Sequence, residues 1–226
     1  MSVSTTTTIS STSAYTPPAF RELYGNQPQV GASPDTLAAF CGGSGARILI
    51  ATVFYGLAVL NLMWFSAAVR TTLADAGYDG WGTAATASSA ALGGLFFLLV
   101  AVVAVVAYSI AGSRNHALIS GLNDFVWAGF VLTSFPRAML IMSSAFGLWR
   151  ARQIANARFA AGVAAVVLVL LGGTNWLSGG LWAPDGAYSR FVSPAIGVVW
   201  GMVVSGVLLR RSPAARAAWR NGRWPP

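Results

Sequence analysis

Residues 95–107 read LFFLLVAVVAVVA, a run without a single polar side chain. With its less apolar flanks it gives a candidate span over about residues 86–111, and a helix needs about 20 such residues to cross the ~30 Å hydrocarbon core of a bilayer. A helix satisfies its backbone hydrogen bonds within the segment, and the run lacks the period-two alternation of a membrane barrel strand. The sequence therefore predicts an all-α membrane protein.

Four further apolar runs lie on either side of this one, at about residues 48–69, 117–149, 159–177 and 191–209. Together the five runs predict a polytopic transmembrane helical bundle of about five spans. The chain divides accordingly into three regions: a Ser/Thr-rich, largely disordered N-terminal tail (1–45), the transmembrane bundle (46–211) and a basic, Trp-containing C-terminal tail (212–226).

The composition excludes several classes of protein. Of the 226 residues, 55% are hydrophobic and 9% charged, against about 25% charged in a soluble domain. This rules out an ordinary soluble enzyme, a disordered chain and a disulfide scaffold. One cysteine (Cys41), one histidine (His116) and scattered Asp cannot assemble a typical zinc or bis-His haem site. Without lysine no Schiff base can form, and we expect neither a metal nor a cofactor.

The net charge of +8 comes from arginines that flank apolar runs, so we expect topology determinants and no nucleic-acid partner. The positive-inside rule favours an N-terminus outside and a C-terminus in the cytoplasm, in a multi-pass protein of the cell membrane. This orientation places inside Arg70, Arg150, Arg152, Arg158, Arg210, Arg211, Arg216, Arg220 and Arg223, and outside Arg21, Arg47, Arg114 and Arg190.

Two short elements are predicted in the tails. Residues 16–25 can form one helical turn that places Phe20 and Tyr24 on a shared face, or serve only as a linker. Residues 214–224 carry arginines and tryptophans, and either lie on the inner leaflet or form a basic tail that only orients the chain.

The third run is the one with ionisable residues, Asp124 and Arg137. Ionisable groups inside a span are costly and are candidates for function. Pro136 kinks the helix and frees the carbonyl of Leu132, and the segment either crosses straight or bends back there. Arg137 is either packed against the kinked helix or binds an anion between helices. Its candidate partners are Asn61, Thr133, Ser134, Ser143 and a backbone carbonyl.

Asp124 is predicted near the outer surface, where the fourth run ends in Asn175 and Trp176. A carboxylate, an amide and an indole N–H can form a satisfied polar cluster, or line a small outward-facing pocket. A lone carboxylate is weak support for acid–base catalysis, so we predict no catalytic residue.

Gly197, Gly201 and Ser205 recur at a spacing of four in the fifth run. Small residues at this spacing let helices approach closely. We expect them to serve packing inside the bundle, and a homodimer contact is the alternative.

The order of motifs resembles that of small, uncharacterised multi-pass membrane proteins common in high-GC bacteria. The resemblance rests on FGLWRAR (146–152), a Gly/Ala/Val span, an aromatic loop, and VVW (198–200) running into LLRR (208–211). It covers about residues 46–211, is topological, and implies no reaction.

Three classes of function remain open. The first is a non-catalytic membrane component or accessory subunit, whose partners are the bilayer and a membrane protein or a second copy of the chain. The second is a carrier or permease for a small anionic or amphipathic molecule, using Arg137 and Asp124. The third is a membrane-embedded enzyme acting on a lipid or isoprenoid.

Overall fold

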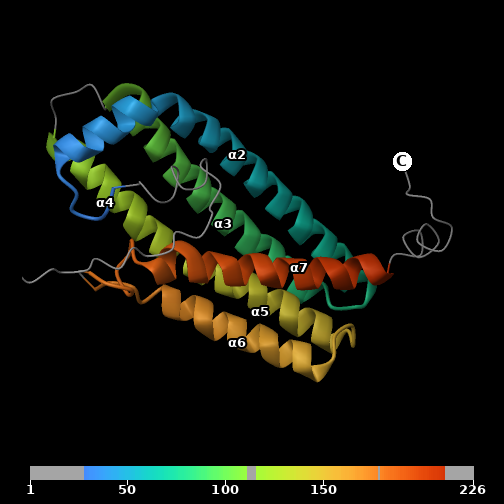
Figure 1. Ribbon diagram of the computed structural model, residues 1–226. Coiled ribbons are helices and arrows are strands. Elements are labelled where there is room, and N and C mark those ends of the chain that lie inside the picture. Colours follow the sequence, from blue (N-terminus) through green and yellow to red (C-terminus); the bar gives the residue numbers. More distant parts are fainter. Residues whose placement is uncertain (1–27, 111–115, 178, 212–226) are drawn as a thin grey trace, which may run out of the picture.

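The computed structural model describes residues 28–110, 116–177 and 179–211, and every regular element in these ranges is helical (Figure 1). This confirms the predicted all-α bundle. The elements predicted at 16–25 and 214–224 lie outside the described residues. The helices are α2 (Pro34–Asp75), α3 (Asp79–Val105), α4 (His116–Leu132), α5 (Ser134–Arg150), α6 (Asn156–Gly172) and α7 (Ser193–Arg211), with π-helical turns η1 (Val106–Ile110) and η2 (Tyr188–Val192).

Four segments of the described chain are long and apolar enough to cross a membrane, as expected for a membrane-embedded protein: Asp35–Asp75, Asp79–Tyr108, Ala117–Arg150 and Tyr188–Arg210. The fifth apolar helix, α6, has 17 residues. At 1.5 Å per residue it is about 25 Å long, somewhat less than the hydrocarbon core. It begins before the predicted run and ends earlier, at Gly172.

Helix α2 starts well before the predicted span of 48–69 and includes residues 34–45, which the sequence analysis placed in the tail. The reason is a local cap. The hydroxyl of Ser33 accepts a hydrogen bond from the Thr36 amide at 3.3 Å, and Pro34 occupies the first helical position. Ser before Pro is a common start of a helix.

A glycine turn separates α2 from α3. The amide of Tyr78 bonds to the Leu73 carbonyl at 2.8 Å, and that of Gly77 to Ala74 at 2.9 Å. This pair of bonds is the Schellman motif, in which the residue at the Gly77 position adopts positive φ. Gly77 has φ of +82°, a conformation that glycine adopts without steric cost.

The third run continues in one direction and does not bend back at Pro136. Helices α4 and α5 are interrupted only at Thr133, which keeps near-helical angles, and Figure 1 shows α5 continuing the direction of α4. Pro136 lies in the first turn of α5. It cannot donate to Leu132, so the ladder breaks just before it.

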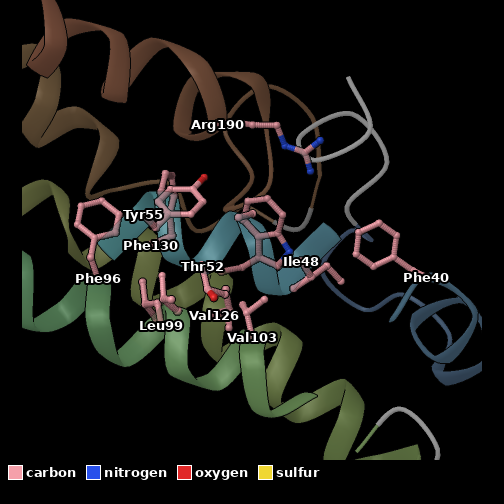
Figure 2. Close-up of a pocket in the computed structure, with 13 residues that line it drawn as sticks. Phe40, Ile48, Thr52, Tyr55, Phe96, Leu99, Val103, Val126, Phe130 and Arg190 are labelled. Atoms are coloured by element: carbon pink, nitrogen blue, oxygen red, sulfur yellow. The ribbon is translucent and has the colours of Figure 1, made fainter. Parts of the chain in front are cut away.

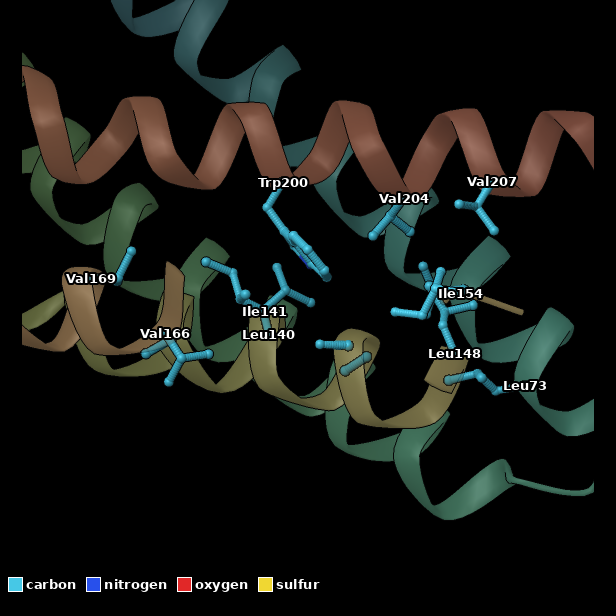
Figure 3. Close-up of a cluster of buried hydrophobic side chains, with 14 residues drawn as sticks. Leu73, Leu140, Ile141, Leu148, Ile154, Val166, Val169, Trp200, Val204 and Val207 are labelled. Atoms are coloured by element: carbon cyan, nitrogen blue, oxygen red, sulfur yellow. The ribbon is translucent and has the colours of Figure 1, made fainter. Parts of the chain in front are cut away.

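Helix α5 is central to the bundle and packs against α3, α6 and α7. Its glycine Gly147 lies against Leu73 and Trp81, and Gly162 of α6 lies against Trp200. The larger hydrophobic core, drawn in Figure 3, joins these helices. It consists of Val69, Leu73, Ala85, Ala138, Leu140, Ile141, Ala145, Leu148, Ile154, Val166, Val169, Trp200, Val204 and Val207.

With α4 and α5 taken together as one segment, successive helical segments run in opposite directions, so their ends gather at two ends of the bundle (Figure 1). The C-terminal ends of α2, α5 and α7 lie at one end with the N-terminal ends of α3 and α6. Within the described chain that end holds Arg70, Arg150, Arg152, Arg158, Arg210 and Arg211.

Candidate functional site

An apolar cavity of about 140 Å³ lies between α2, α3 and α4, and we call it the Arg190 cavity (Figure 2). Most of its wall is aliphatic or aromatic, and its polar side chains are Thr52, Tyr55 and Arg190. The Thr52 hydroxyl already donates to the Leu49 carbonyl at 2.7 Å. The other lining residues are Phe40, Ile48, Ala51, Phe96, Leu99, Val100, Val103, Val126, Trp127 and Phe130.

The guanidinium of Arg190 lies over an aromatic face at the rim of this cavity. Its Cζ atom is 4.9 Å from the centroid of the Trp127 ring. Trp127 is buried and packs edge-to-face against Phe130. A cation at this distance is attracted by the indole face, so the site combines one positive charge with an apolar, aromatic wall.

The loop before α7 positions Arg190. The amide of Asn175 donates to the hydroxyl of Ser189, next to Arg190 in η2. The Arg190 amide bonds to the Gly186 carbonyl at 3.0 Å, and the Tyr188 hydroxyl bonds to the Leu168 carbonyl of α6 at 2.6 Å. These bonds fix the turn that directs Arg190 toward α4.

Three side chains of α4 hold the segment that precedes α2. The indole Nε1 of Trp127 donates to the Pro28 carbonyl, and the Asn123 amide donates to the Gln29 carbonyl, both at 3.1 Å. Asp124 Oδ1 accepts from the Gly31 amide, also at 3.1 Å. Asp124 therefore anchors the start of α2, and it is not among the residues that line the Arg190 cavity.

Arg137 is enclosed between helices instead of facing this cavity. Its Nη1 donates to Ser193 Oγ of η2–α7 at 3.0 Å, and its Nη2 donates to Thr133 Oγ1 at 2.8 Å. Its Cζ lies 5.9 Å from the centroid of Phe130, a residue that lines the cavity. Of the predicted partners Thr133 is present, while Ser193 was not foreseen.

The other predicted site residues are bonded elsewhere. Asn61 is exposed on α2 and donates to the Leu57 carbonyl at 3.2 Å, so it is not a partner of Arg137. The expected cluster of Asp124, Asn175 and Trp176 does not form, because each of these side chains bonds to a different partner. Asn175 is fully buried against Ser189, and the Trp176 indole donates to the Gly173 carbonyl at 3.1 Å. The spacing of residues in the sequence could not predict how the loop between α6 and η2 folds.

Of the small residues predicted to pack on α7, Gly197 lies against another helix and Gly201 does not. A Cβ atom on Gly197 would lie 3.1 Å from Cδ of Arg137, so this glycine allows the arginine to fit between α5 and α7. A Cβ on Gly201 would meet nothing within 4 Å. Ser205 is half-buried. Close helix packing is therefore found at Gly197 and not at Gly201.

The lining of the Arg190 cavity is suited to binding a small molecule. A guanidinium recognises a carboxylate or phosphate oxygen, and aromatic walls accept an apolar group. Within residues 28–110, 116–177 and 179–211 no group of three or more His, Cys, Asp or Glu could hold a metal ion.

Sequence reasoning missed the residues of this cavity. It treated Arg190 only as a topology determinant, and it gave no role in a site to Phe96 or Phe130. The available signal was limited to aromatic residues three apart on one helix face, Trp127 and Phe130. Nothing in the sequence pairs them with an arginine 60 or more positions later.

Comparison with known proteins adds no further assignment. No protein-family model matches the chain, and no curated protein and no solved structure is significantly similar to it. The resemblance to small bacterial membrane proteins therefore stays a prediction, and the site is interpreted from its own geometry.

Proposed function

We propose that this protein is a non-catalytic membrane component that binds a small anion carrying an apolar group in the Arg190 cavity. The observation that carries the proposal is Arg190 over Trp127, at the rim of a cavity whose wall is otherwise nearly all apolar. This keeps the ligand class predicted from the sequence, an anionic or amphipathic small molecule. It replaces Arg137 and Asp124 by Arg190, because Arg190 lines the cavity and neither of the other two residues does.

The volume of the cavity limits the ligand. Apolar protein cavities of about 150 Å³ hold one benzene molecule, and the Arg190 cavity has about 140 Å³. The apolar part of the ligand is therefore a single ring or a short aliphatic chain. A whole isoprenoid does not fit inside.

The test compares two probes that share a ring and differ in charge, benzoate and benzyl alcohol. In detergent we expect benzoate to raise the melting temperature of the protein more than benzyl alcohol does. Ligand at about 100 times its Kd stabilises a folded protein by about 2.7 kcal/mol. Arg190→Gln should remove the preference for benzoate, whereas Arg150→Gln, at the other end of the bundle, should keep it.

A second variant separates binding from folding. Val126→Phe places a ring inside the cavity without changing any charge. It should leave the melting temperature of the free protein near that of the wild type and abolish the benzoate shift. Equal stabilisation by both probes, or a benzoate shift that survives Val126→Phe, would overturn the proposal.

We propose further that the protein lies in the cell membrane with its N-terminus outside and its C-terminus in the cytoplasm. Support comes from the six arginines of the described chain that share one end of the bundle, because positive residues favour the cytoplasmic side. A C-terminal green fluorescent protein fusion should fluoresce in cells, and an alkaline phosphatase fusion at the same point should be inactive. The reverse pattern would overturn this orientation.

A second candidate function, that of an accessory subunit, is favoured by the face of α2 that points away from the other helices. Asn61 is exposed there between the exposed apolar residues Leu57 and Trp64. An amide facing lipid is costly, and interhelical hydrogen bonds of such residues contribute about 0.6–2 kcal/mol. If α2 contacts a helix of a partner protein, Asn61→Leu should release the partner in mild detergent and Asn61→Gln should retain it. Equal complex mass for all three proteins would exclude this role.

A further inference from the structure

A long apolar groove runs between α6 and α7 and ends at two arginines. Its main part, about 650 Å³, is lined by small residues of α6 and by apolar residues of η2 and α7. A second hollow of about 260 Å³ continues it toward Arg210. The two share Arg158 and Val203, so they form one continuous surface, which we call the α6–α7 groove.

The floor of the groove is fixed. Trp200 is buried, and its indole Nε1 donates to Ser144 Oγ of α5 at 2.9 Å. Figure 3 shows this side chain directed from α7 into the core. Gly162 lies directly against the indole, so a larger residue there would displace it. Because Ser144 and Gly162 fix the position of the Trp200 ring, the floor of the groove is part of the packed structure.

Two cations stand at one end of the groove. Arg158 is in the first turn of α6 and Arg210 is near the end of α7, and both are exposed. Within the described residues neither guanidinium has an ion-pair or hydrogen-bond partner, whereas the Arg70 side chain at the same end pairs with Asp79 at 3.3 Å. The groove therefore combines an apolar surface with two arginine side chains that have no acidic partner in the described part of the chain.

We propose that the α6–α7 groove binds one anionic phospholipid of the surrounding bilayer. Its phosphate lies between Arg158 and Arg210, and an acyl chain lies along Val203 and Val199 toward Ala195. Basic pockets between helices on the cytoplasmic side of membranes bind such headgroups. A neutral lipid would fill the same groove but leave both charges without a counter-ion.

The length of the groove fits one leaflet. From Ala195 to Arg210 the helix rises about 22 Å, and half of the hydrocarbon core is about 15 Å thick. A chain that starts at the arginines therefore stays inside the groove throughout its own leaflet. The groove and the Arg190 cavity share no lining residue, although both include residues of η2, and either proposal can fail without the other.

The first test measures lipid retention. The purified full-length protein in detergent is mixed with phosphatidylglycerol or phosphatidylcholine of identical chains, and bound lipid is counted by native mass spectrometry. We expect one phosphatidylglycerol per chain and at least tenfold weaker binding of phosphatidylcholine. Arg158→Gln combined with Arg210→Gln should weaken phosphatidylglycerol binding by roughly 30-fold, while Arg150→Gln, at the same end but outside the groove, should leave it unchanged.

The second test fills the groove without altering charge. Gly206 lines it and has open space around its Cα, so Gly206→Leu introduces a side chain without a clash. Gly201→Leu is the matched control, because Gly201 is also open and does not line the groove. The melting temperature without lipid confirms that each variant folds.

We expect Gly206→Leu to lose bound phosphatidylglycerol and Gly201→Leu to keep it. Equal retention of the two lipids by the wild type, or equal loss in Arg150→Gln and the double variant, would overturn the proposal. So would full retention of the lipid by Gly206→Leu.

Discussion

Arg137 of α5 donates a hydrogen bond to the hydroxyl of Ser193, at the first position of α7, with 3.0 Å between Nη1 and Oγ. The two residues are 56 positions apart in the chain. The same guanidinium bonds to Thr133, at the point where α4 gives way to α5. Arg137 therefore links the break in the third span to the start of the last helix, and Gly197 leaves room for its stem.

Removing the acceptor of this bond should destabilise the fold. Ser193→Ala leaves a buried guanidinium N–H without its partner, which costs about 1–3 kcal/mol. We expect a lower melting temperature in detergent. Arg137→Met, which removes the buried charge together with its N–H donors, should cost less, because it leaves no guanidinium N–H unsatisfied. A wild-type melting temperature for Ser193→Ala would show that the bond contributes nothing.

Gly82 should be intolerant of any side chain. A Cβ there would lie 2.9 Å from the backbone Cα of Arg70, so α2 and α3 would have to separate. Overpacking of this kind costs about 1–3 kcal/mol, and Gly82→Ala should lower the melting temperature. Gly80→Ala is the control, since its Cβ meets nothing within 4 Å, and its stability should equal or exceed that of the wild type. Equal stability of the two variants would contradict the close approach of α2 and α3.

Asp124 should act locally, on the segment before α2. Asp124→Ala removes the acceptor of the Gly31 amide. We expect faster hydrogen exchange at Gly31 and faster proteolysis near it, because the Gly31 amide loses its hydrogen-bond acceptor. Asp124→Asn keeps an oxygen acceptor and should change exchange less. Asp75→Ala, an exposed acid at the end of α2, serves as control, and unchanged exchange in Asp124→Ala would refute the anchoring role.

The turn after α5 stores backbone strain at Arg152, whose φ is +51°. Gln153 bonds to the Leu148 carbonyl at 2.7 Å, so the turn has the same form as that at Gly77 but without the glycine. A non-glycine residue in this region costs about 1–2 kcal/mol. Arg152→Gly should therefore melt higher than Arg152→Ala, which loses the same side chain. Gly77→Ala should melt lower than the wild type, and the opposite order in either comparison would argue against the assigned turns.

Much of the fold could be predicted from the sequence because hydrophobic length is a local property. The runs around residues 95–107 and 191–209 identify membrane helices without reference to any neighbour. The boundaries were less accurate. The cap formed by Ser33 and Pro34 extends α2 into the expected tail, and the glycines at 172–173 end α6 before its apolar run is complete. These capping signals were present in the sequence, but the predicted helix boundaries followed the apolar runs instead.

What the sequence by itself determined is therefore the class of protein: an all-α bundle of apolar helices, with an ionisable third segment interrupted close to Pro136. Only the tertiary structure decided the role of each polar residue. Asp124 meets an amide 93 positions away, and Arg190 meets Trp127. The physical reason is that a buried polar group must find a partner, and which partner comes within reach depends on how helices far apart in the chain pack together.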